Sequence, residues 1–164
     1  MSQTYEIVED GKAIKCLLCE RTSYHPEDVK QTYCGNCHAF HDGVGKRVAI
    51  WLDDMRSPTG HYSDLIEAHA GQSSVCWVKT VPYFKQAFVK FTQMEGVELA
   101  GVFFDNDLGQ KLEGRHAFTW MEEYVRENSI GPFALHAQTA NLSARRELNS
   151  GFNALQRFWE SKGV

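Results

Sequence analysis

The chain has 164 residues, of which 43% are hydrophobic and 23% charged, which is typical of a globular protein and leaves room for a small appendage beside one core domain. No apolar run approaches the roughly 20 residues of a membrane helix, and the acidic start Met1–Asp10 lacks the features of a secretory signal. We therefore expect a cytoplasmic protein with no membrane contact. The formal net charge of −4 and the isoelectric point of about 6.0 argue against a basic face that coats duplex nucleic acid, but not against a small positive site.

Two Cys-x2-Cys pairs, Cys16/Cys19 and Cys34/Cys37, lie fourteen residues apart near the start of the chain. Two cysteines three residues apart on a tight turn can place both sulfur atoms about 2.3 Å from one Zn²⁺, and a second pair, returned by a hairpin, completes a tetrahedral shell. The alternative of two disulfides needs an oxidising compartment, which the missing secretory signal does not support. The spacing therefore predicts a structural zinc ribbon.

The predicted ribbon and a linker, Phe40–Gly45, make up residues 1–45, and the remaining residues 46–164 form the expected second domain. His38 and His41 stand beside the second cysteine pair, but four thiolates already fill the metal shell, so we expect packing or surface histidines. Cys76 lies in an apolar run and is expected in the core. Because a closed zinc site performs no chemistry, the ribbon would serve as a platform for a protein or nucleic-acid partner.

Residues 46–164 alternate short apolar runs with amphipathic stretches. Such alternation predicts a parallel sheet with right-handed crossovers, in a receiver-like or flavodoxin-like α/β fold that carries helices on both faces. The stripe Phe118, Met121, Tyr124 and Val125 is expected to be core. Strands are expected at 48–52, 74–80, 99–104 and 132–136, and helices at 62–70, 82–94, 115–127 and 143–162.

A polar cluster follows three of the four predicted strands, in the segments Asp53–Pro58, Asp105–Gly109 and His136–Asn141. Open α/β sheets bind ligands at the carboxyl ends of their strands, so we expect these clusters to share one site. Charged residues have no packing reason to follow apolar strands three times at the same edge. This coincidence is the strongest functional feature of the sequence.

Asp53, Asp54, Asp105 and Asp107 are candidate ligands of a divalent cation. Carboxylates held within a few ångströms repel one another unless protons or a cation compensate, and oxygen-only ligands favour Mg²⁺ or Mn²⁺. Asp54 and Asp107 could instead cap the turns that follow the strands.

The remaining candidates are cationic or amide side chains and one histidine. Arg56 and Arg145 offer planar donors for phosphate oxygens, although either could be a surface residue. Gln138 and Asn141 are further candidates for substrate binding. His136 closes an apolar strand, where a histidine serves either as a packing residue or as a proton donor.

The runs Ile50–Pro58, Phe104–Gly109 and His136–Asn141 together resemble the cyclic-phosphate-processing receiver family over about residues 47–160. The resemblance implies a receiver-like fold and processing of cyclic phosphates in RNA repair or nucleotide signalling. It also implies that Asp53 with Asp54, Asp105 with Asp107, and His136 are the family's motif residues. The second motif of the family usually reads Asp-His-Asp-Leu-Gly, whereas this chain has Asn106 in the histidine position.

Three functions remain open from the sequence. The first is a metal-dependent phosphodiesterase that hydrolyses a cyclic phosphate on an RNA end or a nucleotide, with Asp53 and Asp105 on the cation and His136 as proton donor. The second is a receiver that is phosphorylated on Asp105, although the fourth strand is expected to end in His136 rather than a hydroxyl residue and no fifth strand with a lysine is evident. The third is an inactive binding module, which Asn106 keeps open.

Overall fold

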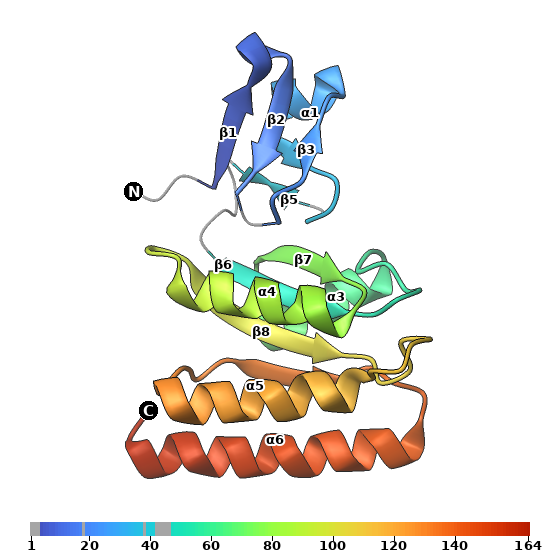
Figure 1. Ribbon diagram of the computed structural model, residues 1–164, viewed down its shortest axis with the longest axis vertical. Coiled ribbons are helices and arrows are strands. Elements are labelled where there is room, and N and C mark those ends of the chain that lie inside the picture. Colours follow the sequence, from blue (N-terminus) through green and yellow to red (C-terminus); the bar gives the residue numbers. More distant parts are fainter. Residues whose placement is uncertain (1–3, 18, 38, 42–46) are drawn as a thin grey trace.

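The computed structural model describes residues 4–17, 19–37, 39–41 and 47–164. Figure 1 shows a small N-terminal unit that packs against one edge of a larger α/β domain. The predicted linker Phe40–Gly45 and His38 fall largely or wholly outside the described residues. Among the residues that the structure describes, no helix combines the length and the apolar character needed to cross a membrane.

The N-terminal unit consists of short elements around the four cysteines. Strands β1 (Tyr5–Val8), β2 (Ala13–Cys16) and β3 (Thr22–Ser23) form an antiparallel sheet, with the turn η1 (Glu9–Gly11) between β1 and β2. Helix α1 (Pro26–Gln31) leads to a second hairpin of β4 (Tyr33–Cys34) and β5 (Ala39–Phe40). The two hairpins bring the two cysteine pairs to the same place, as the spacing predicted.

The larger domain is built on four parallel strands in the order β7-β6-β8-β9. These are β6 (Arg47–Leu52), β7 (Ser74–Val78), β8 (Glu98–Phe104) and β9 (Ala134–Ala137). The helices between and after them are α3 (His61–Ala70), α4 (Val81–Gln93), α5 (Gly114–Asn128) and α6 (Leu142–Lys162). The predicted receiver-like α/β fold is therefore confirmed.

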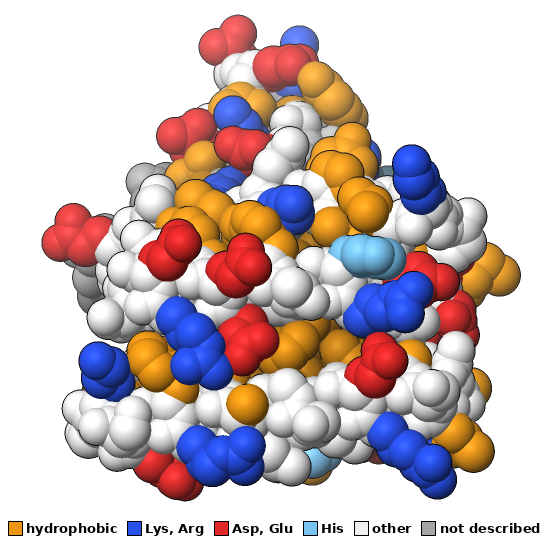
Figure 2. Space-filling view, turned by 60° about the horizontal axis from the view of Figure 1, so that its bottom comes forward, with side chains coloured by type: hydrophobic (Ala, Val, Ile, Leu, Met, Phe, Trp, Pro, Cys, Tyr) orange, Lys and Arg blue, Asp and Glu red, His pale blue; other side chains and the backbone are white. Residues whose placement is uncertain are grey.

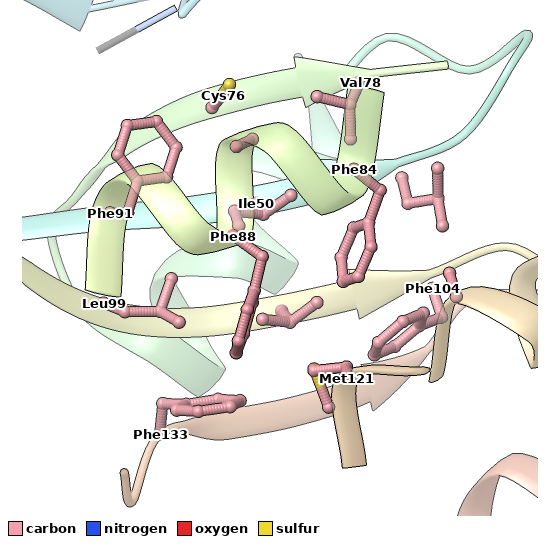
Figure 3. Close-up of a cluster of buried hydrophobic side chains, with 14 of the residues drawn as sticks. Ile50, Cys76, Val78, Phe84, Phe88, Phe91, Leu99, Phe104, Met121 and Phe133 are labelled. Atoms are coloured by element: carbon pink, nitrogen blue, oxygen red, sulfur yellow. The ribbon is translucent and has the colours of Figure 1, made fainter. Parts of the chain in front are cut away.

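The two faces of the sheet are buried because alternate residues of each strand point to opposite sides. On one face, Trp51 and Phe103 pack against Ile66 and Ala70 of α3. On the other, an aromatic-rich core joins the strands to α4, α5 and α6, and Figure 3 shows Phe84, Phe88 and Phe91 of α4 reaching toward Leu99 and Phe104 of β8. Helices thus cover both faces of the sheet, and this packing fixes the positions of the strand ends.

Two predicted strands differ from the observed ones by two residues at one end for local reasons, whereas the other two each begin one residue earlier than predicted. The strand predicted at 74–80 ends at Val78, because Thr80 is the N-cap of α4 and its hydroxyl accepts a hydrogen bond from the Tyr83 N–H at 3.3 Å. The strand predicted at 132–136 covers Ala134–Ala137 instead, since Pro132 has no N–H to give to a ladder.

The N-terminal unit is joined to the β7 edge by specific contacts. The Val75 N–H donates to the carbonyl of Cys37 at 3.1 Å, and Cys76, which is 2% exposed as expected for a core residue, lies against Cys37. Lys90 of α4 pairs with Glu20 at 3.7 Å. The hydrogen bond from Val75 occupies part of the sheet edge that would otherwise be open.

Candidate functional site

The four N-terminal cysteines form a cluster whose geometry suits one metal ion. The Sγ atoms of Cys16 and Cys37 are 3.7 Å apart, those of Cys19 and Cys34 are 3.5 Å apart, and all four lie within 4.8 Å of one another. Ligands about 2.3 Å from a tetrahedral Zn²⁺ are separated by roughly 3.8 Å. The cysteines are free rather than disulfide-bonded. The cluster is therefore compatible with a structural metal such as zinc.

The protonation of these thiols is mutually dependent because they surround a common point. Hydrogen bonding with Cys16 and Cys19 lowers the pKa of Cys34, whereas hydrogen bonding with the other thiols raises the pKa of Cys37. His41 is buried beside Cys34, and its Nδ1 lies 3.0 Å from the Thr4 hydroxyl. His41 is thus a packing residue, as expected.

A second cluster lies at the carboxyl ends of the two central strands. Asp53 follows β6 and Asp105 follows β8, and one carboxylate oxygen of each lies within 4.8 Å of the other and of an oxygen of Asp54. Asp53 is fully buried and Asp105 is 5% exposed, while Asp54 is half-buried. The adjacent strands thus bring three of the four predicted acidic ligands together.

Arg56 bridges the two buried carboxylates. Its Nε lies 2.8 Å from Asp53 and its Nη2 lies 3.1 Å from Asp105, while Nη1 donates to the carbonyl of Gln138 at 3.0 Å. Burial alone would lower the pKa of Arg56, but the charges of Asp53 and Asp105 and a hydrogen bond with Tyr62 raise it. Arg56 is therefore a fixed positive charge inside the acidic cluster.

The buried position of Asp105 affects its protonation. Burial and the charge of Asp53 raise its pKa, while the charge of Arg56 and a hydrogen bond with the Thr139 side chain oppose that rise. Thr139 is fully buried two residues beyond the end of β9. Sequence reasoning overlooked this hydroxyl because it placed the end of the strand at His136.

Gln138 crosses the top of the sheet next to this cluster. Its Nε2 donates to the carbonyl of Leu52 in β6, two strands away, and its backbone N–H donates to the carbonyl of Phe104. Its side-chain Oε1 is buried and has no hydrogen-bond partner among the described residues. A buried acceptor without a partner is costly, and a ligand donor or a cation would satisfy it.

Asn106 and Asp107 are engaged with the start of α5. The Asn106 side chain accepts a hydrogen bond from the Arg115 N–H at 3.2 Å and donates to Asp107 at 3.2 Å. Asn106 is 3% exposed, whereas Asp107 is exposed and lies outside the group of three carboxylates. Asn106, which occupies the histidine position of the family motif, therefore contacts the first turn of α5.

His136 lies one level below the carboxylates on the α3 side of the sheet. In the parallel register of β8 and β9, His136 lies beside Phe103. Its ring centroid is 4.5 Å from that of His69 in α3. Burial, His69 and Arg145 together lower the pKa of His136. Among the described residues no hydrogen bond or ion pair joins His136 to Asp53 or Asp105.

The last two predicted substrate-binding residues lie at the start of α6. Arg145 donates from Nε to the carbonyl of Thr139 at 3.1 Å. The side chain of Asn141 is the N-cap of α6 and accepts a hydrogen bond from the Ala144 N–H at 3.1 Å. Both residues therefore hold the segment that carries Gln138 and Thr139.

Comparison with known families matches residues 48–154 to the family described as the cyclic-phosphate processing receiver domain. The match covers well over half of the chain and includes both acidic segments, His136 and Thr139. Neither the curated proteins nor the solved structures contain a match.

Proposed function

Since the chain belongs to the cyclic-phosphate processing receiver domain family, we propose that it is a metal-dependent phosphodiesterase that opens a cyclic phosphate on an RNA end or a nucleotide. The observation that carries this proposal is the convergence of Asp53, Asp54 and Asp105 at the strand ends, with oxygen atoms within 4.8 Å. In open α/β sheets this edge is where ligands bind.

The charge of the cluster fits a divalent cation. The three carboxylates carry three negative charges when ionised, and Arg56 offsets one of them through its ion pairs with Asp53 and Asp105. Two negative charges remain, which a single Mg²⁺ or Mn²⁺ neutralises. Asp53, Asp54 and Asp105, whose oxygen atoms lie within 4.8 Å of one another, are the ligands that we assign to it. When bound, the cation would polarise the phosphoryl group and acidify a water molecule.

The protein groups around the cluster then have separate tasks. Hydrolysis forms one bond from the water oxygen to phosphorus and breaks one P–O ester bond of the ring, and the departing oxygen takes up a proton. Arg56 would stabilise the negative charge that develops on the phosphoryl oxygens. His136, whose pKa is lowered by burial, His69 and Arg145, would take the proton from the water and return it to the departing oxygen, which includes the donor role expected from the sequence.

The test is turnover of cyclic phosphates by purified protein. Cyclic mononucleotides and oligoribonucleotides that end in a 2′,3′-cyclic phosphate are incubated without added divalent ion, with Mg²⁺ or with Mn²⁺. Omitting the ion is preferable to chelation, because a chelator would also attack the cysteine cluster. We expect divalent-dependent ring opening, loss of turnover in Asp53→Asn and in Asp105→Asn, and a roughly 10²–10⁴-fold decrease in His136→Gln. Turnover at the wild-type rate in both aspartate variants would refute the assignment.

A second candidate function, a phosphoacceptor receiver, is favoured by the hydrogen bond between Thr139 and Asp105. A hydroxyl at the end of the fourth strand is a receiver feature that the predicted strand end at His136 did not include. In this reading Asp105 attacks the phosphorus of a small phosphodonor, and the donor's leaving group departs with the electron pair of the broken bond. Incubation with acetyl phosphate followed by mass spectrometry distinguishes the two: an adduct on Asp105 without any ring opening supports the receiver, whereas the inactive module gives neither.

A further inference from the structure

A groove runs between the N-terminal unit and the α/β domain. It consists of two hollows of about 790 Å³ and about 640 Å³. Arg21, Asn36, Trp77 and Lys79 line both hollows, so the two are continuous. We call this feature the interdomain groove. Each hollow alone falls in the roughly 300–1,000 Å³ range of a site for one small ligand, so the whole groove is larger than one nucleotide requires.

One end of the interdomain groove meets the acidic cluster. Asp54 and Gly109 line the larger hollow, and the indole N–H of Trp77 donates to the backbone carbonyl of Asp53 at 2.7 Å. The other end passes the cysteine cluster, where Cys34 and Tyr24 line the smaller hollow. A chain that enters along the groove would therefore arrive at the proposed catalytic carboxylates.

Exposed aromatic rings lie along the groove. The aromatic residues among the large hydrophobic side chains that the structure describes as exposed are Tyr24, at 61%, and Tyr83, at 58%. Tyr83 lines the larger hollow and Tyr24 the smaller one. Single-stranded nucleic acids bind by stacking their bases on such rings, and every base has a face that can stack.

The charges of the groove suit a phosphate backbone. Arg21 and Lys79 line both hollows, and neither forms an ion pair with a described carboxylate. The Lys79 ammonium lies over the Trp77 ring at 4.4 Å. Of the three described acidic lining residues, Glu20 pairs with Lys90, Asp28 accepts a hydrogen bond from Ser23, and Asp54 belongs to the acidic cluster. Figure 2 shows one face of the molecule, on which side chains of both signs are interspersed without a uniformly basic surface.

We propose that the interdomain groove binds the single-stranded RNA that precedes the cyclic phosphate, with bases on Tyr24 and Tyr83 and backbone phosphates on Arg21 and Lys79. This inference rests on the proposed function for the phosphate end, and it gives the N-terminal unit a direct part in substrate binding. It also selects an RNA end over a free cyclic nucleotide, because a mononucleotide would leave most of the groove empty.

The experiment measures binding of the full-length, metal-loaded protein to a labelled single-stranded oligoribonucleotide of about eight nucleotides that ends in a 3′-phosphate. Such a product-like end separates binding from turnover. In the double variant Arg21→Ala/Lys79→Ala, we expect weaker binding and a salt dependence of log K that is shallower by about 1.4, since each contact to a single-stranded phosphate contributes roughly 0.7. Tyr83→Ala should weaken binding by roughly 5- to 150-fold.

The matched control is Lys12→Ala/Lys162→Ala, which removes two exposed lysines that do not line the groove and should leave affinity and salt slope unchanged. Wild-type affinity in the groove variants would overturn the proposal, and so would equal affinity of the wild-type protein for the oligonucleotide and for a 3′-mononucleotide. Turnover of a cyclic mononucleotide is measured on the same proteins. Turnover without groove-dependent binding refutes the groove alone, whereas groove-dependent binding without any turnover refutes only the proposed hydrolase.

Discussion

At the scale of single residues, Arg56 holds together the two carboxylates on which the proposed chemistry depends. Asp53 has no exposed surface, so removal of Arg56 leaves a buried negative charge without its partner. We predict that Arg56→Gln lowers the free energy of unfolding by on the order of 3 kcal/mol. Arg56→Lys should lose less, because it keeps the charge but not the planar fork.

Urea denaturation at neutral pH measures both variants. Addition of Mn²⁺ should recover part of the loss in Arg56→Gln, since a cation would replace the missing positive charge. A change below about 0.5 kcal/mol in Arg56→Gln, which is usual for surface substitutions, would show that the bridge contributes little.

His136 should make stability dependent on pH. Burial, the charge of His69 and the charge of Arg145 lower its pKa below the ordinary value of 6.5. On acidification the unfolded chain takes up this proton first, so the stabilising contribution is fully present above about pH 6.5 and is lost as the pH falls through the lower pKa of the folded protein. We predict that His136→Gln loses less stability than wild type between about pH 7.5 and pH 5.5. Equal losses in both proteins would contradict the lowered pKa.

At the scale of secondary-structure elements, α5 starts in direct contact with the loop that carries Asp105. The Gly114 N–H donates to the Asn106 carbonyl at 2.9 Å, and a Cβ on Gly114 would overlap the backbone oxygen of Asp105 and come within 2.9 Å of the Asn106 Cα. We predict that Gly114→Ala costs about 3 kcal/mol, because backbone atoms must move. It should also weaken cation binding at the cluster.

The matched control for that helix contact is Gly35→Ala, since a Cβ there meets only the Tyr33 ring at an ordinary 3.9 Å. Thermal unfolding and a Mn²⁺ titration of the two variants give the comparison. Similar melting temperatures and Mn²⁺ affinities for both would mean that α5 does not hold the Asp105 loop in place.

Most helices and strands could be predicted because the spacing of their apolar residues can be recognised within a short stretch of sequence. The stripe with Phe118 and Met121 is buried in α5 as expected, and Asp53 and Asp105 follow adjacent strands because parallel order places their ends at one edge. The bridging role of Arg56 could not be predicted in the same way, since it depends on the distance between β6 and β8. Thr139 was missed for a local reason, a strand end misplaced by one residue.

At the scale of the whole molecule, the N-terminal unit depends on its metal more than on a core of its own. Its buried cysteines pack against Cys76 and the β7 edge, and so small a unit buries little apolar surface without a metal. We predict about one equivalent of zinc per chain. Cys19→Ser/Cys34→Ser should lose the metal, whereas Cys76→Ala should retain it.

Metal analysis together with circular dichroism checks this dependence. The double variant should keep the helical spectrum of the α/β domain while it loses oligoribonucleotide binding, because the interdomain groove needs both units. Wild-type protein that contains less than about a tenth of an equivalent of zinc, with its cysteines in disulfides, would refute the metal site.

The central claim is that the carboxylates at the strand ends open a cyclic phosphate with the help of a divalent cation. The most direct measurement is a phosphorus NMR time course of an oligoribonucleotide with a 2′,3′-cyclic phosphate end, incubated with Mn²⁺ and either wild-type protein or Asp105→Asn. We predict that the cyclic phosphate resonance is replaced by that of a phosphomonoester with wild type and persists with Asp105→Asn. A cyclic phosphate that persists with wild-type protein in both Mg²⁺ and Mn²⁺, while acetyl phosphate phosphorylates Asp105, would contradict the hydrolase and establish the receiver.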